Sequence, residues 1–247
     1  MNAYDAIAGI YDVDMGASMT LADIDWYLAQ ARAAAGPVLE LGCGTGRVLG
    51  ALRAEGVDAV GVDRSLPMLR QARLRCGPDA PLLRMDLRAL GLRAHFALAL
   101  LPYSLCTSLL DEADWTALAH GLLPALRGGA RIAIDAFVPR AGLTGAGWLR
   151  DYARPLGGRW LLRHKRIEAL ADGSHRIERR YRLRDAFGGR TLVTCERIRP
   201  YPPAALVACC ERHLGRVERV IHDYDEARGP HGARFCSVLV RARGHLP

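Results

Sequence analysis

The segment VLELGCGTGR, at residues 38–47, constrains the fold most. In it a short apolar run ends in an acid and is followed by glycines at alternate positions. An apolar run of this length, bounded by turn residues, is typical of a buried strand. Glycines permit the positive φ angles of a tight turn and let a ligand approach the backbone closely. The segment therefore predicts an α/β fold in which the loop after the first strand can cradle a nucleotide.

Apolar runs and helical patterns alternate as far as residue 137. We expect strands at 37–42, 58–63, 81–86, 95–101 and 130–137, and helices at 21–35, 47–56, 65–76 and 111–123. Strands that alternate with helices indicate βαβ units and a parallel sheet with helices on both faces. A helix at 202–214 and strands at 216–225 and 234–243 would complete a doubly wound, mostly parallel seven-stranded α/β sheet.

A different pattern interrupts this alternation after the fifth strand. Three alternating runs, at 158–170, 174–186 and 189–201, are joined by ADGS and FGG turns, which is the signature of an antiparallel meander. We expect residues 1–140 and 202–247 to form one domain, with a helical cap at 1–36. Residues 141–201 would form an antiparallel β insertion that acts as a lid.

The composition limits the class of protein. The net charge of +8 comes almost entirely from arginine, since Lys165 is the only lysine, and the basic cluster 163–184 interleaves acids. This cluster favours a solvated sheet face over a nucleic-acid surface. No apolar run approaches a membrane-spanning length, and no export signal is visible. The seven cysteines are irregularly spaced, which fits a reducing cytoplasm better than a disulfide framework, so we expect a cytoplasmic protein.

Acids mark the ends of three successive expected strands: Glu40, Asp63 and Asp86. In an open α/β sheet, ligands bind beyond the carboxyl ends of the strands, where these acids would meet. Asp63 follows the glycine loop by about 20 residues, the distance expected for an acid that binds ribose hydroxyls. Arg47 stands where a dinucleotide loop has its third glycine, so the loop does not fit a nicotinamide dehydrogenase.

Taken together, these motifs resemble the class I S-adenosylmethionine-dependent methyltransferases. VLELGCGTGR resembles their first motif, VGVDRSLPML their second, MDLRAL their third, and LRGGARIAIDAF the strand and turn beyond the fourth. The opening YDAIAGIYD and the insertion that closes with ERIRPYPPAAL resemble the small-molecule branch, which includes the amino-sugar and glycine N-methyltransferases. The resemblance covers nearly the whole chain and implies a Rossmann-like sheet. It is specific for the cofactor and loose for the substrate.

The resemblance also implies a site for S-adenosylmethionine, with S-adenosylhomocysteine as the product and no metal. Gly42 and Gly44 would face the methionine part of the donor, and Glu40 would organise their loop. Asp63 would accept hydrogen bonds from both ribose hydroxyls, and Asp86 from the adenine amino group. The other residues expected at the donor are Tyr11 as a cap, Cys43 in the loop, Arg64 and Met68 beside the adenine, Leu87 next to Asp86, and Leu101 near the sulfonium.

Two alternatives for these residues stay open. Glu40 and Arg47 could simply form an ion pair. Met68 could be a core residue instead of flanking the adenine.

Methyl transfer from a sulfonium already has a good leaving group, so proximity and orientation can supply much of the rate. A neutral amine then needs no base, whereas a hydroxyl acceptor usually does. Related small-molecule enzymes lead us to expect a histidine shortly after the fourth strand, but Ser108 stands in that place. Nitrogen is therefore favoured over oxygen, and no catalytic base is assigned. Tyr11, Tyr103 and His222 are the candidates, and His222 could equally be an ordinary loop residue.

The residues expected to line the substrate space are Tyr103, Trp148, Tyr152, Arg199 and Tyr201. Aromatic walls suit a flat or cationic substrate. The segment LPYS, at 101–104, partly resembles the motif with which amino methyltransferases hold a base nitrogen. Leu101 lacks the side-chain acceptor which that chemistry needs, which is evidence against a DNA adenine enzyme.

We therefore expect a methyltransferase that acts on a nitrogen or oxygen of a small molecule, such as a natural-product intermediate. A homodimer is a possible assembly. Two alternatives remain. The basic insertion motivates an RNA or protein methyltransferase. The missing histidine motivates a methyltransferase fold that binds S-adenosylmethionine for a role other than methylation, such as a cyclisation.

Overall fold

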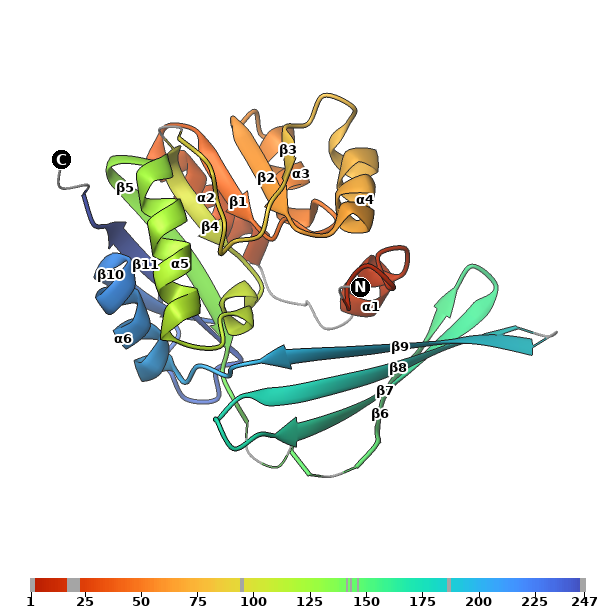
Figure 1. The fold of residues 1–247 in the computed structure, drawn as a ribbon. Helices are drawn as coiled ribbons and strands as arrows, with labels where there is room; N and C mark the ends of the chain where they lie inside the picture. The colour runs from red at the N-terminus through yellow and green to blue at the C-terminus, as the bar shows by residue number, and fades with distance from the viewer. Residues whose placement is uncertain are drawn as a thin grey trace.

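The computed structural model describes residues 3–16, 23–93, 96–140, 142, 144–145, 147–185 and 188–244. These residues form a seven-stranded sheet flanked by helices and a separate four-stranded sheet that extends from it (Figure 1). Residues 21, 22 and 95, with which we expected a helix and a strand to begin, lie outside the described residues.

The seven-stranded sheet has the order β10-β11-β5-β4-β1-β2-β3. Its strands are β1 (Val38–Leu41), β2 (Ala59–Asp63), β3 (Leu82–Arg84), β4 (Phe96–Leu101), β5 (Leu126–Phe137), β10 (Gly215–His222) and β11 (Phe235–Ala242). The first five run parallel, and β11 is antiparallel to both of its neighbours. This arrangement confirms the doubly wound, mostly parallel sheet predicted from the sequence.

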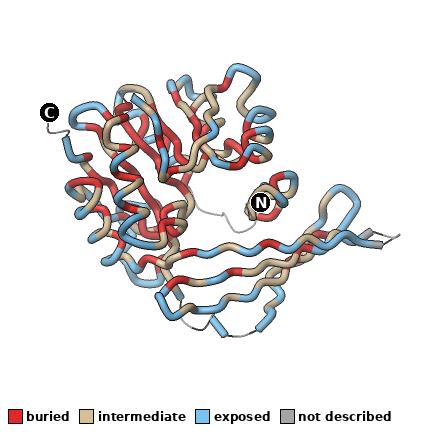
Figure 2. Tube along the Cα trace, viewed as in Figure 1, coloured by how far each residue is buried: buried red, intermediate tan, exposed pale blue. Residues whose placement is uncertain are grey.

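Helices cover both faces of this sheet. One face carries α2 (Asp23–Ala34) and α3 (Arg47–Ala54), with α4 (Leu66–Cys76) beside α3, and the other carries α5 (Glu112–Leu122) and α6 (Pro203–His213). Two short 3-10 turns, η1 (Leu105–Ser108) and η2 (Leu123–Ala125), flank α5. Strands β1 and β4 are buried along their whole length, and Figure 2 shows the buried residues concentrated between the helix layers. Among the described residues, no helix is both long and apolar enough to cross a bilayer.

The second sheet is an antiparallel meander of β6 (Leu149–Leu156), β7 (Arg159–Ala169), β8 (His175–Asp185) and β9 (Gly188–Ile198). The last three strands match the three runs that we predicted. The first strand was missed because a bulge between Arg150 and Tyr152 shifts its alternation, and because it contains Pro155. A proline is tolerated there since β6 is an edge strand.

Residues 3–16, which include α1 (Tyr11–Gly16), form what we call the N-terminal strap. The strap lies between α4 and the four-stranded sheet (Figure 1). Its Ile7 packs against Leu161 and Tyr181, on the face of that sheet which we call the inner face. Its Asp12 accepts a hydrogen bond from Thr45 of the glycine loop at 2.6 Å. The strap therefore connects the two sheets close to the glycine loop.

Candidate active site

The glycine loop combines close packing with one open position. Gly42, Gly44 and Gly46 have φ angles of 63°, 53° and 79°, which side-chain-bearing residues rarely adopt. A Cβ atom on Gly42 would lie 2.7 Å from the Leu105 side chain, and one on Gly46 would lie 2.7 Å from the Cys76 sulfur. A Cβ atom on Gly44 would meet nothing closer than the Gly42 carbonyl oxygen at 3.9 Å. The backbone at Gly44 is therefore where a ligand can approach.

Asp63 lies directly beside this open backbone. One of its carboxylate oxygens accepts from the Gly44 N–H at 2.9 Å, and the other accepts from the Ser65 N–H at 2.8 Å. Burial raises the pKa of Asp63, and these two hydrogen bonds oppose the rise. An ionised carboxylate has about four acceptor positions, so both oxygens can accept further bonds. This geometry fits a vicinal diol such as that of ribose.

Glu40 is a buried acid without an ion-pair partner among the described residues. Its side chain is 2% exposed, and one of its carboxyl oxygens has no hydrogen-bond partner there. Burial raises the pKa of Glu40 to about 8, and the charge of Arg47 opposes this rise. The guanidinium of Arg47 pairs with Asp23 instead, at 2.5 Å. The simple Glu40–Arg47 ion pair that was left open is therefore not formed.

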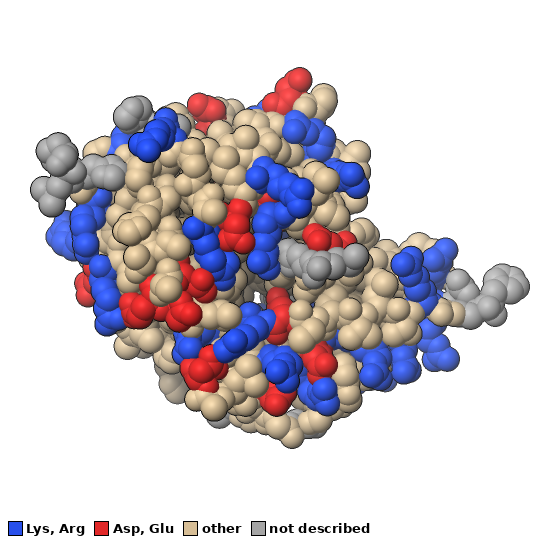
Figure 3. All heavy atoms as spheres, in the orientation of Figure 1, with Lys and Arg blue, Asp and Glu red and all other residues tan. Residues whose placement is uncertain are grey.

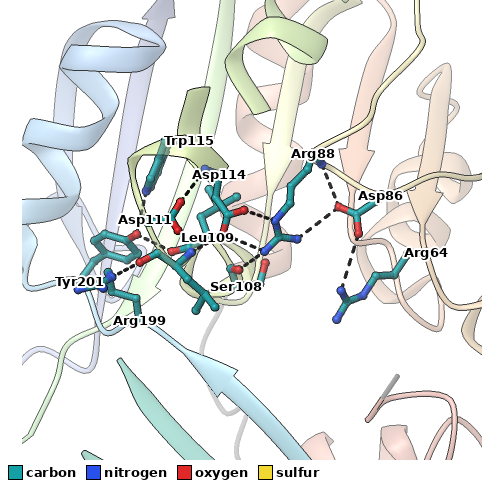
Figure 4. Close-up of polar contacts among 11 residues, drawn as sticks. Arg64, Asp86, Arg88, Ser108, Leu109, Asp111, Asp114, Trp115, Arg199 and Tyr201 are labelled. Atoms are coloured by element: carbon teal, nitrogen blue, oxygen red, sulfur yellow. Dashed lines mark hydrogen bonds and ion pairs between the residues drawn. The ribbon is translucent and has the colours of Figure 1, made fainter. Parts of the chain in front are cut away.

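Asp86 belongs to a polar network after β3 (Figure 4). One of its oxygens accepts from the Arg88 N–H at 2.9 Å, and Arg64 lies 3.8 Å from the other. Arg88 also forms an ion pair with Asp114 at 2.5 Å and donates to the Ser108 carbonyl. The sequence reasoning missed Arg88, which ties the end of β3 to the turn before α5. Its place two residues after Asp86, the acid expected to end the third strand, was the available signal.

The apolar residues expected at the donor are largely buried in protein. Met68, Leu87 and Leu101 are 2%, 9% and 0% exposed. The N–H of Cys43 donates to the Val62 carbonyl, and the Cys43 sulfur faces Gly61. Both contacts join the glycine loop to β2. Met68 is thus buried, and both of its predicted roles stay predictions.

Tyr11 lies in the strap, where its ring meets the ring of Tyr4 edge to face at 6.0 Å. Burial raises its pKa, and Tyr103 and Arg47 also act on it electrostatically, in opposite directions. Tyr103 follows β4, the strand next to β1 in the sheet. The structure therefore brings the predicted cap residue and the first predicted substrate residue to the same region, beside the glycine loop.

Asp135, in β5, contacts the turn that carries Tyr103, and the sequence did not reveal this contact. Its fully buried carboxylate accepts from the N–H groups of Tyr103 and Ser104, at 2.9 and 2.6 Å, and from the hydroxyls of Tyr27 and Tyr224. In the sequence it is one acid inside an apolar run, and nothing there indicates which side chains its carboxylate meets.

The other predicted substrate residues are placed differently from one another. The hydroxyl of Tyr152 donates to Asp14 of the strap, so Tyr152 lies on the inner face of the four-stranded sheet. Trp148 stacks with Arg166 and Arg180, which alternate with the inner-face residues of β7 and β8. Trp148 is therefore on the outer face, away from the strap, and the expectation that it lines the substrate space is not supported by its position.

Arg199 and Tyr201 hold the end of the insertion against the main domain (Figure 4). Arg199 donates to the carbonyls of Leu110 and Asp172. Tyr201 is 5% exposed, and its hydroxyl donates to the Leu109 carbonyl at 2.6 Å. Both have structural partners, and Tyr201 belongs to the hydrophobic core and not to an open wall.

His222 ends β10, which is separated from β4 by β11 and β5. The described residues contain no group of three side chains that could hold a metal ion.

Comparison with known proteins agrees with this geometry. Residues 38–129 match the family model of the methyltransferase domain. No curated protein matches the sequence significantly. Similar solved structures include the CcbJ methyltransferase of Streptomyces caelestis, at 22% identity and a TM-score of 0.82, over 98% of this chain and 99% of that one.

Two further similar structures are sugar-modifying enzymes by name. The sugar N-methyltransferase KedS8 of a Streptoalloteichus species is 22% identical with a TM-score of 0.74, over 94% of this chain and 93% of that one. CalS10, an amino pentose methyltransferase of Micromonospora echinaspora solved with bound S-adenosylmethionine, is 20% identical with a TM-score of 0.71, over 94% and 97%. The chain therefore has the class I S-adenosylmethionine-dependent methyltransferase fold over nearly its whole length and a methyltransferase domain at residues 38–129, which confirms the predicted fold and enzyme class.

Proposed function

We propose that this methyltransferase transfers a methyl group from S-adenosylmethionine to a nitrogen of a small molecule, such as an amino-sugar-containing natural-product intermediate. The observation that carries the donor assignment is the pairing of the open Gly44 backbone with the Asp63 carboxylate. The names of the similar sugar N-methyltransferase and amino pentose methyltransferase support the acceptor class.

The donor-binding roles follow from position and chemistry. Asp63 would accept from both ribose hydroxyls with the capacity that Gly44 and Ser65 leave on its oxygens. Asp86 would accept from the adenine amino group, because Arg88 and Arg64 hold its carboxylate at the edge of the sheet. The bound donor supplies an electrophilic methyl group.

Orientation by neutral groups fits an amine acceptor. Ionised groups act on Tyr11 and Tyr103 from several elements, and each already has a protein partner. Arg47 pairs with Asp23, Arg163 pairs with Asp14, and Glu196 pairs with Arg179. Burial raises the pKa of both Tyr11 and Tyr103, so their hydroxyls are neutral hydrogen-bonding groups, able to orient a neutral amine without removing a proton.

In this proposal, residues 1–140 and 202–247 hold the donor, and the insertion at 141–201 roofs the acceptor. The strap supports this division because it contacts both parts. Asp14 of the strap is fixed by Arg163 and Tyr181 of the insertion, while Asp12 is fixed by Thr45 and Arg75 of the donor domain.

The insertion gives less support to RNA as a substrate. Several of its arginines pair with acids of the same sheet, as Arg166 does with Glu178 and Arg176 with Glu168. Basic and acidic side chains are also interspersed along the middle of the face in Figure 3. Over this part of the surface, the charges do not form the continuous positive stripe that tracks a phosphate backbone.

Calorimetry with S-adenosylhomocysteine tests the donor assignment. We expect binding by the wild-type chain and a loss of about 100-fold in affinity for Asp63→Ala, since two hydrogen bonds to a charged acceptor are removed. Asp79→Ala is a matched control, because Asp79 is an exposed acid of the same domain. Absence of binding by the wild type at millimolar ligand, or equal affinities of the two variants, would refute the assignment.

The acceptor class is tested by turnover. A panel of amino sugars, simple amines and hydroxyl compounds is incubated with the wild-type chain and S-adenosylmethionine, and S-adenosylhomocysteine is measured. Faster turnover of amines than of the matched hydroxyl compounds is expected. Preferential turnover of the hydroxyl compounds would overturn the choice of nitrogen.

A further inference from the structure

Asp135 is a buried carboxylate whose described partners are all neutral. It is 0% exposed, and its hydrogen bonds come from two tyrosine hydroxyls and two backbone N–H groups. Burying an ionised carboxylate without a cation is costly unless hydrogen bonds satisfy it. The four groups that donate to Asp135 must therefore be held at fixed positions around its carboxylate.

The two backbone donors belong to an unusual turn. Tyr103 and Ser104 have φ angles of 55° and 61°, so two consecutive residues with side chains adopt the left-handed conformation. Such conformations are strained and persist only where the surrounding structure enforces them. Here Asp135 accepts from both N–H groups, and the Ser104 hydroxyl oxygen accepts from the Phe137 N–H at 2.9 Å. Residues of β5 thus impose the turn from the neighbouring strand.

This turn directly borders the glycine loop. It follows β4, which pairs with β1, and the Leu105 side chain lies against Gly42. The Tyr103 ring packs 5.9 Å from the Phe235 ring. The charges that act on Tyr103 come from Asp135 itself and from three other elements, through Arg163 of the insertion, Arg47 of α3 and Asp14 of the strap. Tyr103 therefore stands where the donor domain, the strap and the insertion meet.

We propose that Asp135 is a positioning residue for methyl transfer, which clamps the Tyr103–Ser104 turn in its left-handed conformation and so fixes Tyr103 beside the bound donor. The inference rests on the proposed function, because only a methyl acceptor oriented at this junction would depend on the position of Tyr103. Asp135 itself acts through the turn.

Asp135→Asn is the direct test, since asparagine has nearly the same shape but offers one acceptor oxygen in place of two. With the best acceptor of the amine panel, kcat should fall about 100-fold, the loss that a misplacement of about 1 Å can cause. The Kd of S-adenosylhomocysteine should stay within about threefold, since neither Gly44 nor Asp63 contacts Asp135 through any described hydrogen bond.

Loss of stability alone is separated by a control. Trp115→Phe removes a buried hydrogen bond from the Trp115 Nε1 to the Tyr201 hydroxyl, on the other helix-covered face of the sheet. Its kcat should remain within about twofold of wild type at a temperature where both variants are folded. If both variants lose kcat in proportion to their loss of Tm, the positioning role is overturned.

Amide hydrogen exchange, measured with S-adenosylhomocysteine present, gives a readout that does not require the methyl acceptor to be known. In Asp135→Asn, the N–H groups in the peptide covering residues 102–108 should exchange at least about tenfold faster, because their acceptor is weakened. The peptide covering 42–50 should be unchanged. Unchanged protection of 102–108, or unchanged kcat, would refute the inference. Failure of the proposed function would instead appear in the wild type, as absence of ligand binding or turnover.

Discussion

Arg47 and Asp23 form a two-point ion pair in which the guanidinium donates to both carboxylate oxygens, at 3.0 and 2.5 Å. The Asp23 side chain is 3% exposed, so this pair fixes α2 against the start of α3, directly after the glycine loop. Replacing Arg47 by methionine leaves a buried carboxylate without its cation. We expect a loss of about 3 kcal/mol in the free energy of unfolding, measured by urea denaturation.

The double variant Arg47→Met/Asp23→Asn supplies the control for this prediction. It removes both charges, so much of the lost stability should return. An equal or larger loss in the double variant would show that packing of the long Arg47 side chain, and not the ion pair, sets the effect.

The buried Glu40 predicts a particular pH dependence of stability. Burial raises its pKa from 4.5 to about 8, so the folded chain retains a proton that the unfolded chain releases above pH 4.5. The contribution of the protonated Glu40 carboxyl to the free energy of unfolding is therefore fully present below pH 4.5 and is lost as the pH rises through about 8. Between about pH 5 and 8, the Tm of the wild type should fall relative to that of Glu40→Gln, measured by calorimetry. Parallel Tm curves for the two proteins would contradict the assigned protonation.

Two acids on the strap helix should differ strongly in their effect on stability. Asp14 is buried and pairs with Arg163 at 2.5 Å, whereas Asp12 pairs with Arg75 at an exposed position. Asp14→Asn should cost about 2 kcal/mol in the free energy of unfolding, because it removes the charge from one of the two carboxylates that pair with the buried Arg163, the other being Asp151. Asp12→Asn should cost less than about 1 kcal/mol. Chemical denaturation of both variants checks this, and equal losses would argue against a buried clamp.

The position of Trp148 predicts a variant that leaves catalysis intact. Its ring lies on the outer face of the four-stranded sheet, beneath Arg166 and Arg180. Trp148→Ala should keep kcat and KM within about twofold of wild type, whereas Tyr103→Ala should raise KM or lower kcat about tenfold or more. Turnover of the best amine of the panel compares the two. A strong loss of activity in Trp148→Ala would restore this residue to the substrate space.

Local patterns were sufficient to predict the seven-stranded sheet. Buried runs alternate with capped helices, as where the Asp111 side chain accepts from the Asp114 N–H at the start of α5. The positive φ angles of Gly42 and Gly44 also follow from residue type, because few other residues adopt them. The strand β6 was missed, since a bulge and Pro155 remove its alternation.

The sequence by itself determined the parallel sheet, its glycine loop and the acids at its edge. The hydrophobic periodicity and the turn residues that predict these features involve residues close together in the chain. Only the tertiary structure decided that Arg47 pairs with Asp23, that Tyr201 lies in the core, and that Trp148 faces outward. It also decided that Asp135 meets the turn at Tyr103. These contacts join residues that are distant in the chain, and their partners depend on strand register and on how the strap and the two sheets pack together.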